Sequence, residues 1–201
     1  FIGIGLIMLF YLIRHRRMHP DHVRFVGGCV LAAGILIPAS IIVTTPTAYQ
    51  DFIAHIRLHR NTPLTNHMGL ETILSHDPGG RMVYTRDDRL SDPFEGWKRG
   101  RTERTQDRRP LYVAINLGLL AWLAWALRRT RLLWVGFALS VPMICSILNL
   151  TCYYYSIFLA PAVLALVVPG LAPAYLTLAG ASKVLLGRFS FIDDKYTAES
   201  Y

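Results

Sequence analysis

The stretch from Phe25 to Thr44 reads FVGGCVLAAGILIPASIIVT, which is 20 residues without a charged side chain. About 20 apolar helical residues are needed to cross the hydrocarbon core of a bilayer, so this stretch predicts one membrane crossing. Pro38 lies inside it and predicts a kink, which a membrane helix tolerates where neighbouring helices cover the freed backbone groups. The stretch therefore favours a membrane protein.

Other apolar runs follow the same pattern along the chain. Leu111–Leu127 and Leu132–Leu150 each predict one crossing, while Cys152–Gly180 exceeds one span and contains several prolines. This last run is either one long helix broken at Pro169 or one crossing followed by a half-helix. The first run, Phe1–Ile13, is too short to cross, and we interpret it as the tail of a segment that begins upstream. We expect an all-α fold, a polytopic transmembrane helix bundle.

Composition and charge narrow the functional classes. The chain is 53% apolar and only 17% charged, which excludes disordered, collagen-like and coiled-coil proteins. Its net charge of +8 lies in connections between apolar runs, where basic residues orient a membrane protein and contact anionic lipids. We therefore expect membrane lipids as partners and no nucleic acid. The apolar runs hold no charged residue from Phe25 to Thr44, from Leu111 to Leu127 or from Leu132 to Ser182, which argues against a pump or a channel.

The short basic connections also predict an orientation, because cytoplasmic loops are enriched in arginine and lysine. The chain then divides into three regions. Residues 1–44 contain two transmembrane segments, of which the first is incomplete, and residues 45–110 form an extracytoplasmic and mostly helical loop. Residues 111–201 contain two to four further transmembrane segments and a cytoplasmic tail. The basic residues used for this assignment are Arg14, Arg16, Arg17 and Arg24, then Arg128, Arg129 and Arg131, and finally Lys183 and Arg188.

Three helices are predicted in the outer segment. Residues Ala48–Arg60 place apolar side chains at helical spacing and predict an amphipathic helix on the membrane surface. His67–His76 predicts a short helix with Asn66 as its N-cap. A third, basic helix is predicted after Asp92, with a proline at its first position and a glutamate at its third.

A capped helix start at Asn66 would present free backbone N–H groups, which suit a phosphate or a sugar hydroxyl. Arg57, His59 and Arg60 lie just upstream, and guanidinium groups bind phosphate in bidentate fashion. Together these residues could hold the phosphate of a lipid-linked substrate. The alternative is that Asn66 only caps its helix and that the arginines contact lipid phosphates.

The remaining constellations give weaker signals. His55, His59 and His67 lack the cysteine or carboxylate spacing of a zinc site, so we expect a solvated polar stripe and no metal or cofactor. The three cysteines resemble small packing residues more than a disulfide framework. Tyr153, Tyr154 and Tyr155 lie at the outer end of an apolar run, where aromatic side chains either anchor the helix or line a substrate site.

With these features in order, the chain resembles the C-terminal half of membrane glycosyltransferases of the GT-C type, in particular the bacterial polyprenyl-phosphate-mannose-dependent mannosyltransferase family. The resemblance rests on the Asn-centred motif Leu64–Leu70, LTNHMGL, and on the aromatic turn Asn149–Tyr155, NLTCYYY. The family's usual Gly-Asn-Gln-Ser-Leu is here Thr-Asn-His-Met-Gly-Leu, and the Ser-Pro and Trp-His-His signature of the later turn is replaced. Asn66 is the residue that matches the family motif.

The resemblance implies transfer of a sugar from a polyprenyl-phosphate donor on the extracytoplasmic face of the bacterial cytoplasmic membrane. The catalytic carboxylate of such enzymes lies in their first outer loop, which here would be upstream of Phe1. An alternative is a non-catalytic subunit of a membrane assembly, in which the charged stretch Asp92–Arg109 docks a protein partner. On the enzyme interpretation the expected substrate-binding residues are Arg57, His59, Arg60, Asn66, His67 and Tyr154.

Overall fold

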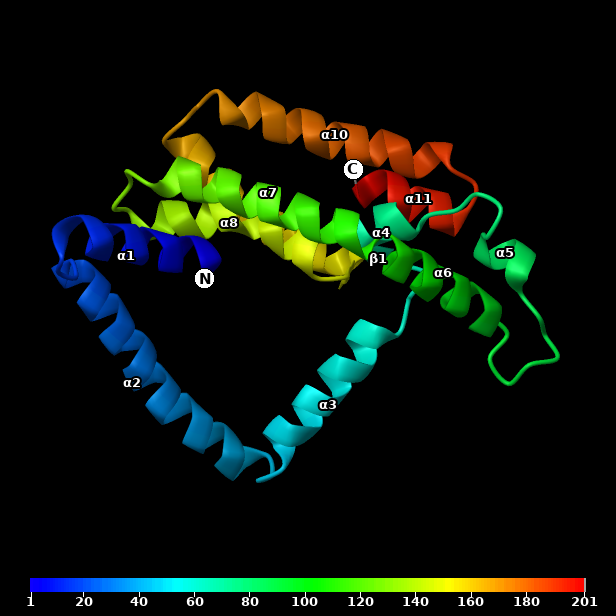
Figure 1. The fold of residues 1–201 in the computed structure, drawn as a ribbon, viewed down its shortest axis with the longest axis horizontal. Coiled ribbons are helices and arrows are strands. Elements are labelled where there is room, and N and C mark those ends of the chain that lie inside the picture. Colours follow the sequence, from blue (N-terminus) through cyan, green and yellow to red (C-terminus); the bar gives the residue numbers. More distant parts are fainter. Residues whose placement is uncertain (201) are drawn as a thin grey trace. The chain divides into compact units, whose positions relative to one another are not determined.

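The structure is a computed structural model that describes residues 1–200, although the side chains of Asn61, Tyr153–Tyr155 and Leu185 lie outside its described part. The fold is all-α, with 75% of residues in helices and 2% in strands (Figure 1). The chain forms two compact units, Phe1–Asn61 with Ala124–Phe137, and Thr62–Leu123 with Ala138–Tyr201. The helices are α1 (Ile2–His15), α2 (Pro20–Val43), α3 (Ala48–Asn61), α4 (Leu70–Ser75), α5 (Met82–Thr85), α6 (Glu95–Asp107), α7 (Arg109–Leu127), α8 (Leu133–Ile147), α9 (Leu159–Ala162), α10 (Leu171–Arg188) and α11 (Ile192–Ser200), with 3-10 helices η1 (Cys152–Phe158) and η2 (Val163–Leu166).

Two of the described helices, α2 and α7, are long and apolar enough to cross a membrane by length and composition, while α1 and α8 are shorter apolar helices. α2 begins five residues earlier than the uncharged stretch alone predicts. Pro20 occupies its first turn, where a missing N–H costs nothing, and the His19 side chain accepts a hydrogen bond of 3.2 Å from the Asp21 amide. The helix thereby includes Arg24, which an apolar pattern leaves out.

In the first unit, α1 packs against the start of α8 through small residues. An added Cβ on Gly3 would lie 2.0 Å from the main-chain oxygen of Gly136, so the two backbones are in direct contact. Ile7 is fully buried one turn further along α1. The predicted amphipathic helix is confirmed as α3, and its apolar side chains Phe52 and Ile56 are exposed.

In the second unit, α7 provides hydrogen-bond donors for the end of α8. The Tyr112 hydroxyl donates to the Ile147 carbonyl at 2.9 Å, and the Asn116 amide donates to the Ser146 carbonyl at 3.4 Å. The last carbonyls of a helix have no partner within that helix, so these side chains satisfy groups that an apolar environment would otherwise leave unpaired. Two side chains thus fix the contact between the two helices.

The long apolar run after Thr151 is broken around Pro169. η1, α9 and η2 follow each other to Leu166, a turn covers the next four residues, and α10 starts at Leu171. Pro169 lies in this turn, where it has no backbone N–H to continue a helix. In Figure 1 α10 returns from the turn to α11, which packs against α4.

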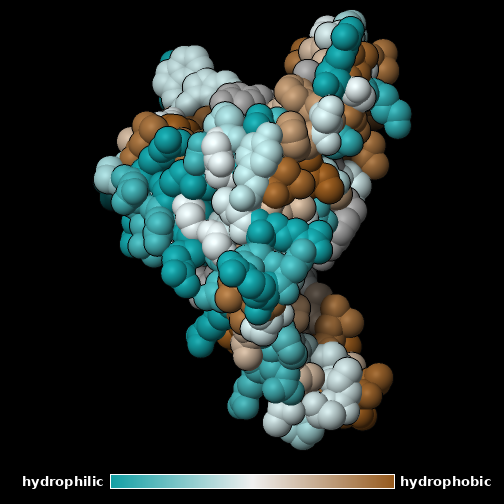
Figure 2. Space-filling model, turned by 90° about the vertical axis from the view of Figure 1, so that its right-hand side faces the viewer, coloured by the Kyte–Doolittle hydropathy of each residue, from teal (hydrophilic) through white to brown (hydrophobic). Residues whose placement is uncertain are grey.

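The polar helices α4, α5, α6 and α11 form one end of the second unit. Figure 2 faces the part of this unit that contains α5 and α6, where the surface is mostly hydrophilic. α6 begins at Glu95, two residues later than predicted, and its N-cap is Phe94 without a side-chain hydrogen bond; the Asp92 carboxylate accepts the Phe94 N–H at 3.1 Å in the turn before the helix. This polar end contains the residues described next.

Candidate functional site

Two short strands join the stretches on which the family resemblance rests. β1 (His67–Met68) pairs antiparallel with β2 (Leu150–Thr151), and His67 lies opposite Thr151. The pairing continues for one further hydrogen bond, since the Cys152 N–H donates to the Asn66 carbonyl at 3.1 Å. The Asn-centred motif and the aromatic turn, far apart in sequence, therefore meet in one place.

Gly69 makes this arrangement sterically possible. Its φ is 123° and its ψ −176°, a conformation that is essentially restricted to glycine. An added Cβ would lie 2.3 Å from the Cys145 carbonyl oxygen, so a larger residue would displace the end of α8. The Gly69 N–H donates to the Ser200 hydroxyl at 2.9 Å, which ties the motif to α11.

The predicted helix from His67 to His76, with Asn66 as its N-cap, is wrong at its start. The helix is α4, Leu70–Ser75, and its N-cap is Gly69 without a side-chain hydrogen bond. Asn66 lies in a turn, and His67 and Met68 are extended because they pair with β2, a contact that local sequence does not reveal. Asn66 contributes to the strand pairing through its main-chain carbonyl, and the residue is half-buried.

The end of α4 is capped by arginines of α6. The Nε–H of Arg104 donates to the Ser75 carbonyl at 2.8 Å, and Arg108 donates to the Leu74 carbonyl. Arg101 donates to the Ser75 hydroxyl at 3.0 Å. Cationic side chains at a helix C-terminus satisfy unpaired carbonyls and interact favourably with the helix dipole. Three arginines at helical spacing thus bond to the end of α4, and Arg108 among them remains exposed.

Arg101 differs from the other two arginines in its surroundings. Its guanidinium lies 5.1 Å from the ring centroid of Trp97, which is 3% exposed. Burial lowers the pKa of Arg101 to about 10, although Asp193 and Glu71 oppose that shift. The group is still charged at neutral pH. Within the described part of the chain, no carboxylate oxygen lies within 4.0 Å of it.

Adjacent aspartates of α11 bind partners on two other helices. Asp193 accepts the indole N–H of Trp97 at 2.7 Å and the backbone N–H of Met82 at 3.2 Å. Asp194 accepts the Nε–H of Arg81 at 3.0 Å, with a second guanidinium nitrogen at 2.9 Å. Both carboxylates are therefore occupied by protein donors.

His76 links α4 to α11. Its Nε2 lies 3.4 Å from Asp194 and its Nδ1 lies 3.2 Å from the Thr197 hydroxyl. Burial lowers the pKa of His76, and the nearby Asp194 and Asp193 only partly offset that effect. In the neutral ring with its hydrogen on Nε2, this nitrogen donates to Asp194, while the Thr197 hydroxyl beside Nδ1 donates to the Asp193 carbonyl at 2.7 Å.

These residues surround a pocket that is about large enough for one water-sized group. His76, Trp97, Arg101 and Asp193 line it. The space is too small for a sugar, and the carboxylates are already paired, so we assign this cluster to positioning the Asn-centred motif. Within residues 1–200 outside the undescribed side chains, no group of three or more metal-ligating side chains is placed to hold a metal ion.

The expected substrate-binding residues fall into two groups. Arg57, His59 and Arg60 are exposed on α3 in the first unit, whereas Asn66 and His67 lie at β1 in the second unit. His67 is buried at 2% exposure. The structure joins Asn66 and His67 to the turn that contains Tyr154; the Tyr154 side chain itself lies outside the described residues.

Sequence reasoning missed the residues that hold the motif in place. The charged stretch containing α6 was interpreted as solvated or as a docking surface, and residues 192–200 as part of a tail. A usable signal was present, because Trp97, Arg101, Arg104 and Arg108 recur at i, i+4, i+7 and i+11 and so share one face of a helix. No comparable signal marks Asp193.

The comparisons with known proteins return no relative. No family model matches the chain, and no curated protein and no solved structure matches it.

Proposed function

We propose that this chain is part of an integral membrane glycosyltransferase of the GT-C type, which transfers a sugar from a polyprenyl-phosphate donor on the extracytoplasmic face of the bacterial cytoplasmic membrane. The observation that supports it is the pairing of β1 with β2. The Asn-centred motif and the aromatic turn were identified separately as points of resemblance, and their meeting is expected if both belong to one substrate site.

The proposal includes a polytopic arrangement of the apolar helices. α10 is about 27 Å long, and the segment from η1 to η2 is about 28 Å long, from the rise per residue of each helix type. Both lengths approach the roughly 30 Å of a bilayer core. In this arrangement α8, the η1–η2 segment and α10 cross in succession, and α2 and α7 provide the longest spans.

This arrangement revises the side assigned to the end of the chain. The positive-inside rule placed Lys183 and Arg188 in the cytoplasm, before a cytoplasmic tail. The packing of α11 on α4 requires that residues 192–200 lie on the same side as α4. The proposal therefore has α10 returning to the extracytoplasmic side, with the connection at Pro169 on the cytoplasmic side.

In the proposed reaction, a carboxylate from the upstream part of the protein acts as general base on the acceptor hydroxyl. As the acceptor oxygen bonds to the sugar C1, polyprenyl phosphate leaves with negative charge, and Arg57, His59 and Arg60 of α3 are the candidates to stabilise that charge. Asn66 is the candidate sugar contact in the second unit. The polar cluster of α4, α6 and α11 fixes the strands and takes no part in the chemistry.

The test uses the full-length protein in membranes with polyprenyl-phosphate-mannose as donor. Arg57→Ala and Asn66→Ala are compared with Arg99→Ala and Gln106→Ala, which alter exposed side chains of α6. Loss of one charge-assisted hydrogen bond corresponds to roughly 10- to 100-fold weaker donor binding. We expect that loss for Arg57→Ala and a smaller one for Asn66→Ala, together with slower sugar transfer.

The competing hypothesis is the non-catalytic subunit. It expects no donor binding by the purified protein, the same result for all four variants, and stable co-purification with a membrane partner. The hydrogen bonds of Arg101 and Arg104 weaken this hypothesis, because α6 uses these two arginines inside its own unit and not on a docking surface.

A further inference from the structure

The packing of α1 on α8 brings two basic segments of the first unit together. Gly3 contacts Gly136, and a Cβ on Gly136 would lie 2.6 Å from the Cδ1 of Ile7. From this contact α1 continues for two turns to His15, while the chain before Gly136 leads back to Arg131. The end of α1 therefore lies beside the α7–α8 connection, and the two segments form one open pocket.

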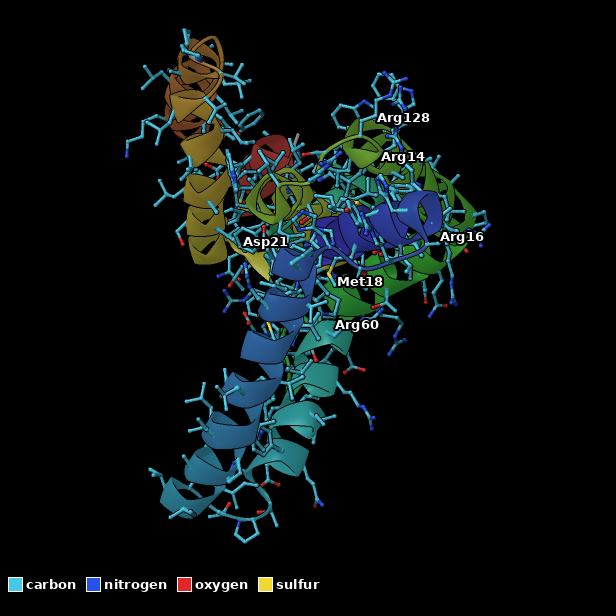
Figure 3. All side chains as sticks on the ribbon, turned by 90° about the vertical axis from the view of Figure 1, so that its left-hand side faces the viewer. Arg14, Arg16, Met18, Asp21, Arg60 and Arg128 are labelled. Carbon is cyan, nitrogen blue, oxygen red and sulfur yellow. The ribbon has the colours of Figure 1, made fainter. Side chains whose placement is uncertain are left out.

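The pocket is lined by positive charge. Arg14 comes from α1, and Arg128, Arg129 and Arg131 come from the α7–α8 connection. Figure 3 shows Arg14 and Arg128 as neighbours in this unit. Four guanidinium groups at one pocket repel one another unless an anion lies between them.

Acidic residues of the first unit do not neutralise these arginines. The unit contains nine arginines and only two acidic residues, Asp21 and Asp51. Asp21 pairs with Arg24 at 2.9 Å, and Asp51 lies on α3. In the described part of the chain, none of the four pocket arginines has a carboxylate within 4.0 Å.

Aromatic side chains hold two of the guanidinium groups in place. Arg128 lies 4.3 Å from the ring centroid of Trp125 and donates to its carbonyl, and Arg131 lies 6.0 Å from the ring of Tyr11. A guanidinium already held in one orientation loses less entropy when it binds an anion, and its planar fork matches phosphate oxygens. Trp125 is 61% exposed at the end of an apolar helix, the position that tryptophan prefers at lipid head groups.

We propose that this pocket binds a phosphate group, supplied either by the head group of an anionic phospholipid or by a soluble phosphate compound. The exposed tryptophan and the adjoining apolar helices favour the lipid. The site consists of different residues from those proposed for sugar transfer, so the phosphate-binding proposal can be tested independently of that function.

The test compares two variants of the full-length protein. One carries Arg14→Gln, Arg128→Gln and Arg131→Gln. The matched control carries Arg86→Gln, Arg89→Gln and Arg99→Gln, which removes the same charge from arginines that already pair with carboxylates. Native mass spectrometry then measures the phosphatidylglycerol retained after extraction from membranes of phosphatidylglycerol and phosphatidylcholine.

Each basic residue near an anionic lipid surface contributes roughly fivefold to binding, so the pocket variant should bind phosphatidylglycerol about a hundredfold more weakly. Wild type and control should retain it equally. Replacing the same three arginines by lysine should restore only part of the binding, because lysine keeps the charge but not the fork.

A second arm separates the two sources of phosphate. Inorganic phosphate is titrated into delipidated protein, and the melting temperature is recorded. If the protein retains phosphatidylglycerol but inorganic phosphate leaves the melting temperature unchanged, the ligand is a lipid head group. If phosphate raises the melting temperature but no lipid is retained, the ligand is a soluble compound. In both cases the pocket variant should lose the binding and the control variant should keep it. Equal binding by the pocket variant and the control in both arms would overturn the proposal, as would binding in neither arm.

Discussion

Replacing Gly69 by alanine is the sharpest test of how the two motif stretches are held together. Strain in a glycine-only backbone region costs about 1–3 kcal/mol. The new Cβ would lie 2.3 Å from a main-chain oxygen of α8, and overpacking of that kind adds about 1–3 kcal/mol. Alanine also reduces the conformational entropy of the unfolded chain, which offsets about 0.4–1 kcal/mol of this loss, so we expect a net destabilisation of about 1–6 kcal/mol.

For a chain of this size that loss lowers the melting temperature by about 2–24 °C. The assay is thermal unfolding of the detergent-purified full-length protein, followed by tryptophan fluorescence and near-UV circular dichroism. Gly79→Ala is the matched control, because a Cβ there meets only the Asp77 carboxylate at an ordinary 3.5 Å. Equal melting temperatures for Gly69→Ala and Gly79→Ala would refute the reasoning about the strand pairing.

Three further predictions concern other contacts. Asp193→Ala leaves two donors without an acceptor, among them the buried indole of Trp97, and should destabilise the protein by about 2–4 kcal/mol in denaturant unfolding; Asp193→Asn keeps one acceptor oxygen and should cost less than half as much. The pKa of His76 is held below its ordinary value of 6.5, so the unfolded chain takes up a proton first as the pH falls. The free energy of unfolding should therefore decline below about pH 6.5, and a titration of His76→Gln that shows the same decline would contradict this assignment. Gly136→Ala should lower the melting temperature through its clash with α1, whereas Gly5→Ala, with open space around it, should leave that temperature unchanged or raise it.

Much of the helical content could be predicted because it depends on short-range patterns. Uncharged apolar runs and helical spacing located α2, α3, α7 and α8 to within a few residues. The errors at their ends have local causes. At α2, for example, a cap supplied by His19 and the proline in the first turn shift the helix boundary without changing the apolar pattern.

The site could be predicted only in part because its contacts are long-range. The sequence identified both motif stretches, but not that Asn66 and Cys152 share a backbone hydrogen bond. Local sequence favours Asn66 as a helix N-cap, but in the structure the Asn66 carbonyl accepts a hydrogen bond from the residue after β2. Likewise, no sequence pattern near Asp193 predicts that its carboxylate accepts a hydrogen bond from the indole of Trp97, 96 residues away. Local propensity gives way where tertiary contacts satisfy the same backbone groups.

The packing of α11 on α4 bears on the topology that we propose. Lys183 and Arg188 favour a cytoplasmic end, and each is worth about 1 kcal/mol at an anionic surface. Asp193 and Asp194 of α11 accept hydrogen bonds from Trp97 and Arg81, and hydrogen bonds to charged groups contribute about 1.5–3 kcal/mol each. We infer that these contacts outweigh the two cations. Under the proposed membrane arrangement, α10 must therefore return to the side of α4, and the break before Leu171 is what allows the chain to reverse.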